Sequence, residues 1–165
     1  MKKIALAASV LALSASPAFA QASSTTAGTA NATVVKAISV THDSGAALNF
    51  GAFTVGTAAG TLAVSTSGGR SVTGGATAIA NSTTSADSFT VSGDASRAFN
   101  ITIPASASVS SGSGTIAFIP AVAASSATLS AAGAATFTVG GTLNTLGTEL
   151  AGNYTGTYNV TVSYN

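Results

Sequence analysis

The sequence contains no cysteine and no tryptophan, and it has a single histidine. Without cysteine the fold cannot depend on disulfide bonds, and a chain of 165 residues is long enough to bury a core without them. One histidine without cysteine is a poor donor set for a transition metal. We therefore predict no cofactor and no metal site, and the missing tryptophan weakens the case for a sugar-stacking surface.

Charged side chains are also scarce, at 5% of the sequence. After residue 20 there are three basic and four acidic side chains, which gives that part of the chain a net charge of −1. Nucleic-acid binding needs clustered Lys and Arg to neutralise phosphates, and a polybasic membrane patch needs the same. The expected partners therefore exclude nucleic acid.

The first residues have the pattern of a secretory signal peptide. Lys2 and Lys3 precede an apolar run at 4–13, and the small-x-small triplet Ala-Phe-Ala occupies 18–20. The run is about half of the ~20 residues needed to span a bilayer, so we predict no transmembrane helix. We predict a cleaved signal peptide at 1–20 and Sec-dependent export to the periplasm, the cell surface or the medium.

The rest of the chain divides into a polar start and a long alternating region. Residues 21–32 are small and polar, and we predict a flexible N-terminal extension. From residue 33 onward, short runs alternate apolar and polar side chains between Gly, Ser and Asn, as in Phe99, Ile101 and Ile103. The same alternation recurs at 48–50, 62–64, 89–91, 116–118 and 137–139. This pattern predicts a single all-β domain at 33–165, an antiparallel β-sandwich of about nine or ten short strands, immunoglobulin-like or pilin-like.

The clearest alternation is at the C-terminus. Tyr154, Tyr158 and Tyr164 share one parity of residues 154–164, and threonine, asparagine and serine occupy the other. Successive side chains of a strand point to opposite faces, so this predicts one long strand with an apolar and a polar face. We expect the three tyrosines to pack in the core or in an interface.

Few residues could support catalysis, and none forms a convincing set. His42 and Asp43 are adjacent, but no Gly-x-Ser-x-Gly motif accompanies them, so we interpret them as a solvated pair where the first strand ends. Asp87 and Asp94 flank one predicted strand and Glu149 is isolated. We interpret these carboxylates as turn and solubility residues, predict no catalytic, cofactor-binding or metal-binding residue, and expect that the protein is not an enzyme.

Glycine pairs at 68–69 and 74–75 lack the lysine and the following helix of a phosphate-binding loop, so they predict turns, as does the pair at 140–141. Five Asn-x-Ser/Thr sequons occur, at Asn31, Asn81, Asn100, Asn153 and Asn159. Because threonine is so abundant in this chain, we interpret them as coincidence. Lys36 interrupts an apolar parity, which indicates either a protected edge strand of this domain or a donor strand for another subunit.

Several segments resemble the bacterial secreted family named domain of unknown function 4402. They are 47–51 (ALNFG), 69–70, 74–75, 137–143 (FTVGGTL) and 152–165 (GNYTGTYNVTVSYN). The resemblance covers essentially the whole chain after the signal peptide, and the ending is its most specific part. It implies an architecture and no assigned activity.

The ending also resembles the C-terminal strand of bacterial pilins and spore-coat-type subunits, which often close on an alternating strand with a penultimate aromatic residue, here Tyr164. That resemblance implies two partners: a periplasmic chaperone, and other surface subunits whose N-terminal extensions complete the fold by strand addition. Unlike common pilins, this sequence has no cysteine pair.

Export, scarce charge and the lack of a catalytic set favour an exported cell-surface structural or adhesive protein. A pilin-like or fimbrial subunit that assembles by β-strand addition is the form we expect first. Two alternatives remain open on the sequence. One is a small outer-membrane β-barrel, and the other is a soluble periplasmic ligand-binding β-sandwich.

Overall fold

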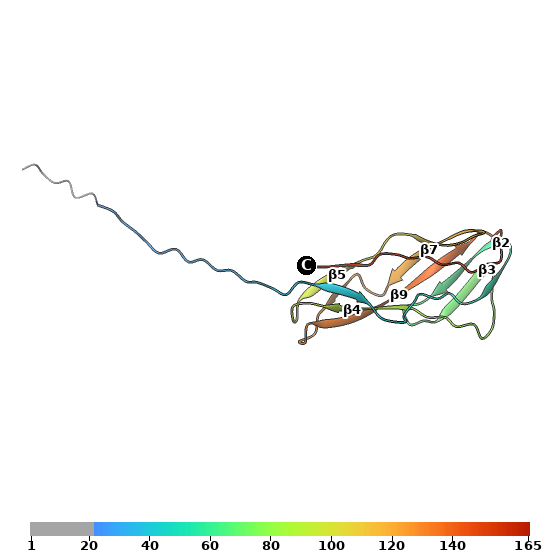
Figure 1. The fold of residues 1–165 in the computed structure, drawn as a ribbon, viewed down its shortest axis with the longest axis horizontal. Coiled ribbons are helices and arrows are strands. Elements are labelled where there is room, and N and C mark those ends of the chain that lie inside the picture. The colour runs from blue at the N-terminus through green and yellow to red at the C-terminus, as the bar shows by residue number, and fades with distance from the viewer. Residues whose placement is uncertain (1–21) are drawn as a thin grey trace, which may run out of the picture. The chain divides into compact units, whose positions relative to one another are not determined.

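The computed structural model describes residues 22–165, so the predicted signal peptide at 1–20 lies outside the described residues. The chain divides after Thr33 into two units, of which Val34–Asn165 is the larger. Residues 22–33 are exposed and contain no helix or strand. The strands all belong to Val34–Asn165 (Figure 1).

Ten strands and no helix form residues 22–165, which confirms the all-β prediction. They are β1 (Ser39–His42), β2 (Phe53–Val64), β3 (Arg70–Ala78), β4 (Asp87–Ser92), β5 (Ala98–Thr102), β6 (Ala107–Ser111), β7 (Gly114–Val122), β8 (Ser126–Thr128), β9 (Ala134–Thr145) and β10 (Thr161–Tyr164). The short alternations at 62–64 and 137–139 prove to be parts of the two longest strands, β2 and β9, with 12 residues each.

Strand β9 organises the larger sheet. Its first half pairs with β4, its second half pairs with β2, and β7 also pairs with it. Strands β1, β3 and β6 complete this sheet of seven strands, and β10, β5 and β8 form a second sheet of three. Every strand pair is antiparallel, and Figure 1 shows β9 running through the middle of the compact unit.

The core consists of two clusters. The first follows one row across the larger sheet, because cross-strand register aligns apolar side chains of five strands: Val72, Leu62, Leu143, Phe118 and Ala107. Phe50, Phe53, Tyr154 and Tyr158 also belong to this cluster or pack against it. Phe53 begins β2, and the other three lie outside the strands.

The second cluster lies between the two sheets. Phe99 and Ile101 of β5 are buried against Val91 of β4 and Leu129, with Val162 of β10 packed beside them. Alternate burial along β4 and β5 follows the sequence alternation, with apolar positions inside. This face-to-face packing of two antiparallel sheets is a β-sandwich, as predicted.

The prediction of one long strand at 154–164 is wrong. Only Thr161–Tyr164 forms a strand, paired with β5, and Thr155 makes a separate bridge to Ser110 of β6. The segment therefore passes from an edge of the larger sheet to an edge of the smaller one, and between them it has no strand to pair with. Burial still alternates over most of its length, and the tyrosines remain on the inner side.

Two of the three predicted glycine turns are also wrong. The pair at 68–69 lies in a turn, but 74–75 lies within β3 and 140–141 within β9. A Cβ atom at Gly75 would overlap the carbonyl oxygen of Ala58, and one at Gly140 would overlap that of Val64. These glycines allow close backbone approach inside the sheet, and the pair at 74–75 lies beside the bulge between β2 and β3.

Candidate functional site

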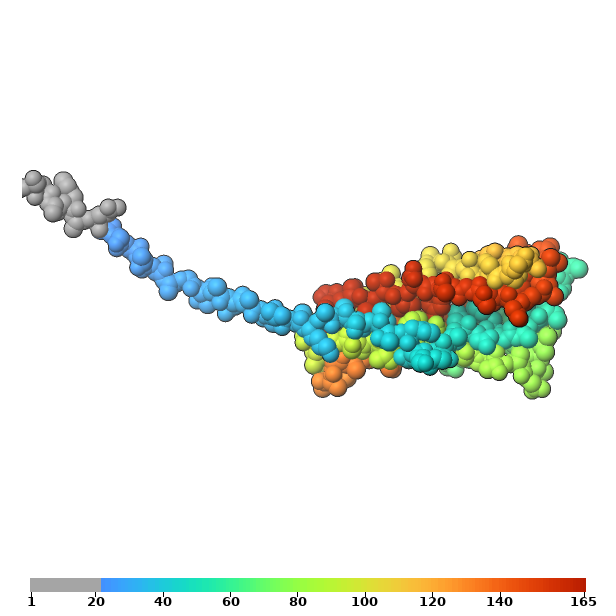
Figure 2. All heavy atoms as spheres, in the orientation of Figure 1, coloured from blue at the N-terminus to red at the C-terminus, as the bar shows by residue number. Residues whose placement is uncertain are grey.

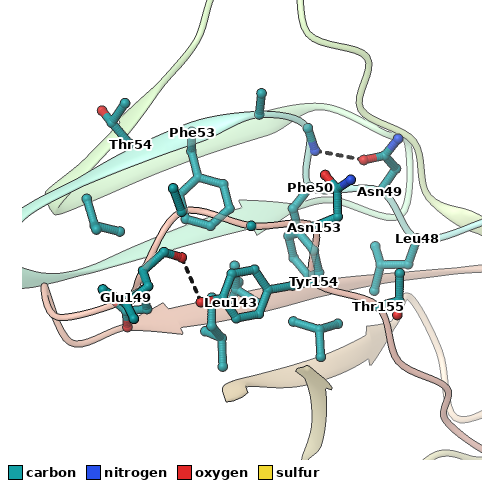
Figure 3. A pocket seen from close by; sticks show the side chains of 18 of the residues that line it. Leu48, Asn49, Phe50, Phe53, Thr54, Leu143, Glu149, Asn153, Tyr154 and Thr155 are labelled. Atoms are coloured by element: carbon teal, nitrogen blue, oxygen red, sulfur yellow. Dashed lines mark hydrogen bonds between the residues drawn. The ribbon is translucent and has the colours of Figure 1, made fainter. Parts of the chain in front are cut away.

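A groove of about 910 Å³ opens over the first core cluster (Figure 3). One wall is residues 48–55 and the other is 149–155, with Val109, Ile116 and Leu143 also lining it. Figure 3 shows Phe53 and Tyr154 entering the groove from these two walls. Its lining is more apolar than polar, and it is open to solvent.

The groove forms where β2 and β9 separate. β2 pairs with β9 only at 60–64, whereas its first residues, 53–55, pair with β3 alone. Among the described residues, no strand occupies the other edge of 53–55. The groove therefore contains an unpaired strand edge, whose backbone N–H and C=O groups are able to bind another strand.

Glu149 shapes the far wall. Its carboxylate accepts hydrogen bonds from the backbone N–H groups of Leu146 (2.5 Å), Gly147 (2.9 Å) and Thr148 (3.2 Å). Partial burial acts to raise the pKa of Glu149, but these backbone donors outweigh it and hold that pKa below its usual value. Glu149 is the one charged side chain that lines the groove, and its own loop already satisfies it.

The three tyrosines pack on the inner side, as predicted. Tyr154 and Tyr158 lie against the first cluster and Tyr164 against the second. The Tyr154 hydroxyl donates to the carbonyl oxygen of Leu150 at 2.8 Å, which closes the wall 149–155 on itself. The aromatic ring of Tyr154 thus forms part of the groove, and its polar end is satisfied locally.

A second candidate site is a polar cluster around Asp87. The His42 Nε2 atom lies 2.6 Å from Asp87 Oδ1, and the Tyr158 hydroxyl donates to Asp87 Oδ2 at 2.7 Å. The backbone N–H of Ser88 also donates to Oδ1, at 2.9 Å. Asp87 is only 5% exposed. The cluster thus joins β1, β4 and the C-terminal segment through one buried carboxylate.

This cluster corrects the interpretation of two residues. Asp87 is not a turn or solubility residue, because it begins β4 on the same inward parity as Phe89. His42 does end the first strand, but its partner is Asp87 and not Asp43. Asp43 accepts hydrogen bonds from the hydroxyls of Ser88 (2.5 Å) and Thr90 (2.7 Å), which lower the pKa of Asp43.

The hydrogen bonds of the Asp87 cluster hold β1, β4 and the C-terminal segment together, and we call this cluster the latch. Burial, followed by the hydrogen bond to the Asp87 carboxylate, raises the pKa of Tyr158, so its hydroxyl stays a neutral donor. Among residues 22–165, no serine or threonine hydroxyl is hydrogen-bonded to His42. The arrangement therefore fixes three segments and presents no activated nucleophile.

The remaining predicted residues lie at a turn and at the C-terminus. Asp94 lies in the turn after β4, as predicted, and its carboxylate pairs with Arg97 at 3.1 Å. The Tyr164 hydroxyl accepts from the Asp94 N–H (2.6 Å) and donates to the carbonyl oxygen of Lys36 (2.7 Å). Figure 2 shows the C-terminal residues at the surface of the compact unit. Lys36 itself precedes β1, an edge strand of the larger sheet.

Other predicted positions lie apart from both sites or at their margin. The sequon asparagines are all exposed: Asn31, Asn81, Asn100, Asn153 and Asn159. Within residues 22–165, no three His, Asp or Glu side chains come close enough to hold a metal ion together. That same part of the chain has no helix long and apolar enough to cross a membrane.

The fold and the groove define an all-β sandwich domain with an unpaired strand edge over an apolar hollow. Residues 38–164 match the model of the family described as Domain of unknown function (DUF4402). The chain belongs to this family, which confirms the resemblance of its sequence segments. Neither the curated proteins nor the solved structures provide a match.

Sequence reasoning missed the groove and the latch for different reasons. Asp87 had a signal, since it shares the parity of Phe89 and Val91 and so points inward from a strand. The groove had no such signal in the sequence, because its position depends on the residue at which β9 stops pairing with β2.

Proposed function

We propose that this protein is an exported bacterial surface subunit, structural or adhesive, that assembles with other copies of itself by β-strand addition. The observation that carries the proposal is the unpaired segment 22–37. Every residue of this segment is exposed and none belongs to a strand, although it directly precedes the domain. A mature chain would therefore present a strand-forming segment with no place in its own sheets.

The composition of the segment and of the domain supports this proposal. Residues 22–35 carry no charge and no proline, so nothing in them opposes pairing with a sheet edge. Val34 is 97% exposed, which is unusual for a β-branched apolar residue that has no partner. Scarce charge over the whole chain lets neighbouring copies approach with little repulsion.

A second function is favoured by the groove itself. An apolar hollow of about 910 Å³ is within the size range of small-molecule sites, so a soluble periplasmic ligand-binding domain is the competing proposal. The two proposals differ in stoichiometry. A ligand-binding domain stays monomeric when its groove fills, whereas a strand-adding subunit grows with concentration.

The test is the size of the native protein taken from its host. Cells are sheared gently, and the released material is separated without heating and again after heating. We expect high-mass species that collapse to a single monomer band on heating. Monomer alone, recovered from the periplasmic fraction and absent from the sheared material, would contradict the proposal and favour the ligand-binding domain.

A further inference from the structure

The groove and the unpaired segment have complementary properties, although they belong to different parts of the chain. We propose that the groove between 48–55 and 149–155 is the acceptor site for residues 29–36 of a second copy. This inference rests on the proposed function and adds the donor residues and the acceptor site to it.

The first argument is the backbone. Residues 53–55 of β2 have an unpaired edge within the groove, and strand addition needs such an edge. β9 leaves this position after Thr145, where it pairs with Gly60. An added strand would continue the sheet beyond β2 in the place that β9 vacates, and its N–H and C=O groups would pair with those of 53–55.

The second argument is the side-chain pattern. In an extended chain, Ala30, Ala32 and Val34 share one face, which ends at Lys36, and the other face is polar up to Thr33 and then carries Val35. The apolar face would lie on a floor that includes Ile116 and Leu143. Small side chains at 30 and 32 let the donor backbone approach the floor closely, and Val34 would bury the surface that it exposes in the single chain.

The third argument is length and charge. Residues 29–36 and the wall 48–55 have the same number of residues, which in extended form span roughly 26 Å. The donor has no charge before Lys36, and the sole charged side chain lining the groove, Glu149, is bonded to its own loop. Neither partner therefore buries an unpaired charge before position 36.

The test uses the absence of native cysteine. A donor chain carries Val34→Cys, and an acceptor chain carries Val55→Cys and lacks residues 22–37. Mixing them allows a disulfide only between donor and acceptor or between two copies of one variant, and these dimers differ in mass. A matched control acceptor carries Ala117→Cys instead, at an exposed position of β7 outside the groove.

We expect the donor–acceptor disulfide with Val55→Cys at roughly ten times the yield found with Ala117→Cys, because disulfides require a close Cβ approach. Moving the donor cysteine to Thr33, on the opposite face, should lower the yield. Equal yields at Val55 and Ala117 would overturn the acceptor site. If the chains still assemble but the disulfide yields at Val55 and Ala117 are equal, only the acceptor site is contradicted and the proposed function is not. If donor and acceptor never associate, both the acceptor site and the proposed function are contradicted.

A second measurement does not depend on engineered cysteines. A labelled peptide with the sequence of residues 29–37 is titrated against the chain that lacks 22–37, and its fluorescence polarisation is followed. Saturable binding that a scrambled peptide does not show supports the acceptor site. An unchanged signal overturns it.

Discussion

Replacing Asp87 with alanine tests whether the buried polar cluster holds the domain together. The substitution removes the acceptor for the Tyr158 hydroxyl, for the Ser88 N–H and for His42 at once. The neighbouring Asp43 carboxylate already accepts hydrogen bonds from the Ser88 and Thr90 hydroxyls. Two donors would then remain in a largely buried site without a partner.

The size of the effect follows from burial. A hydrogen bond to a charged group contributes ~1.5–3 kcal/mol, and an orphaned buried donor costs a similar amount. The His42 side chain is 50% exposed, so water compensates for most of its lost contact. Tyr158 and Ser88 together give an expected loss of about 3 kcal/mol in the free energy of unfolding, or roughly 10 °C in Tm for a domain of this size.

Urea unfolding of residues 21–165 at neutral pH measures this loss. The matched control is Asp94→Ala, which removes an exposed carboxylate from its pair with Arg97 and should cost less than ~1 kcal/mol. Tyr158→Phe alone should cost about 1 kcal/mol, and nearly nothing when Asp87 is already alanine. Equal losses for Asp87→Ala and Asp94→Ala, or additive losses in the double variant, would refute the latch.

Two further predictions concern backbone packing in the larger sheet and the pH dependence of the domain's stability. Gly75→Ala should destabilise the domain by ~2 kcal/mol or more in thermal unfolding, because a Cβ would overlap the Ala58 carbonyl, whereas Gly112→Ala, with open space around it, should be near neutral. Asp43 has a pKa lowered by the Ser88 and Thr90 hydroxyls, so its stabilising contribution is present above its unfolded pKa and disappears as pH falls through its folded pKa. The stability lost in Ser88→Ala should therefore shrink as pH falls through the lowered pKa of folded Asp43, and a loss that is constant with pH would contradict this cause.

Much of the fold could be predicted from the period of the sequence. Alternation at Phe99 and Ile101, or at Leu62 and Val64, identifies strands and their buried faces, because one side of each strand must leave water. The tyrosines of the C-terminal segment obey the same rule even where the segment forms no ladder. Burial is thus readable from alternation, but hydrogen-bonded pairing is not.

The errors have a common origin in that difference. Paired glycines are typical of turns, but two of these pairs lie inside strands, where glycine allows a neighbouring backbone to approach closely: Gly74–Gly75 and Gly140–Gly141. The groove arises in the same way, from the residue at which two strands part. Such features depend on register between distant segments, and a single sequence carries no local signal for it.

The central claim is that copies of this protein associate through the segment before β1. Sedimentation velocity over a range of concentrations, on residues 21–165 and on the same chain without residues 22–37, tests it most directly. We expect a sedimentation coefficient that rises with concentration for residues 21–165 and stays at the monomer value for the shortened chain, with cooperative thermal unfolding of both. Identical sedimentation of the two folded chains would contradict it.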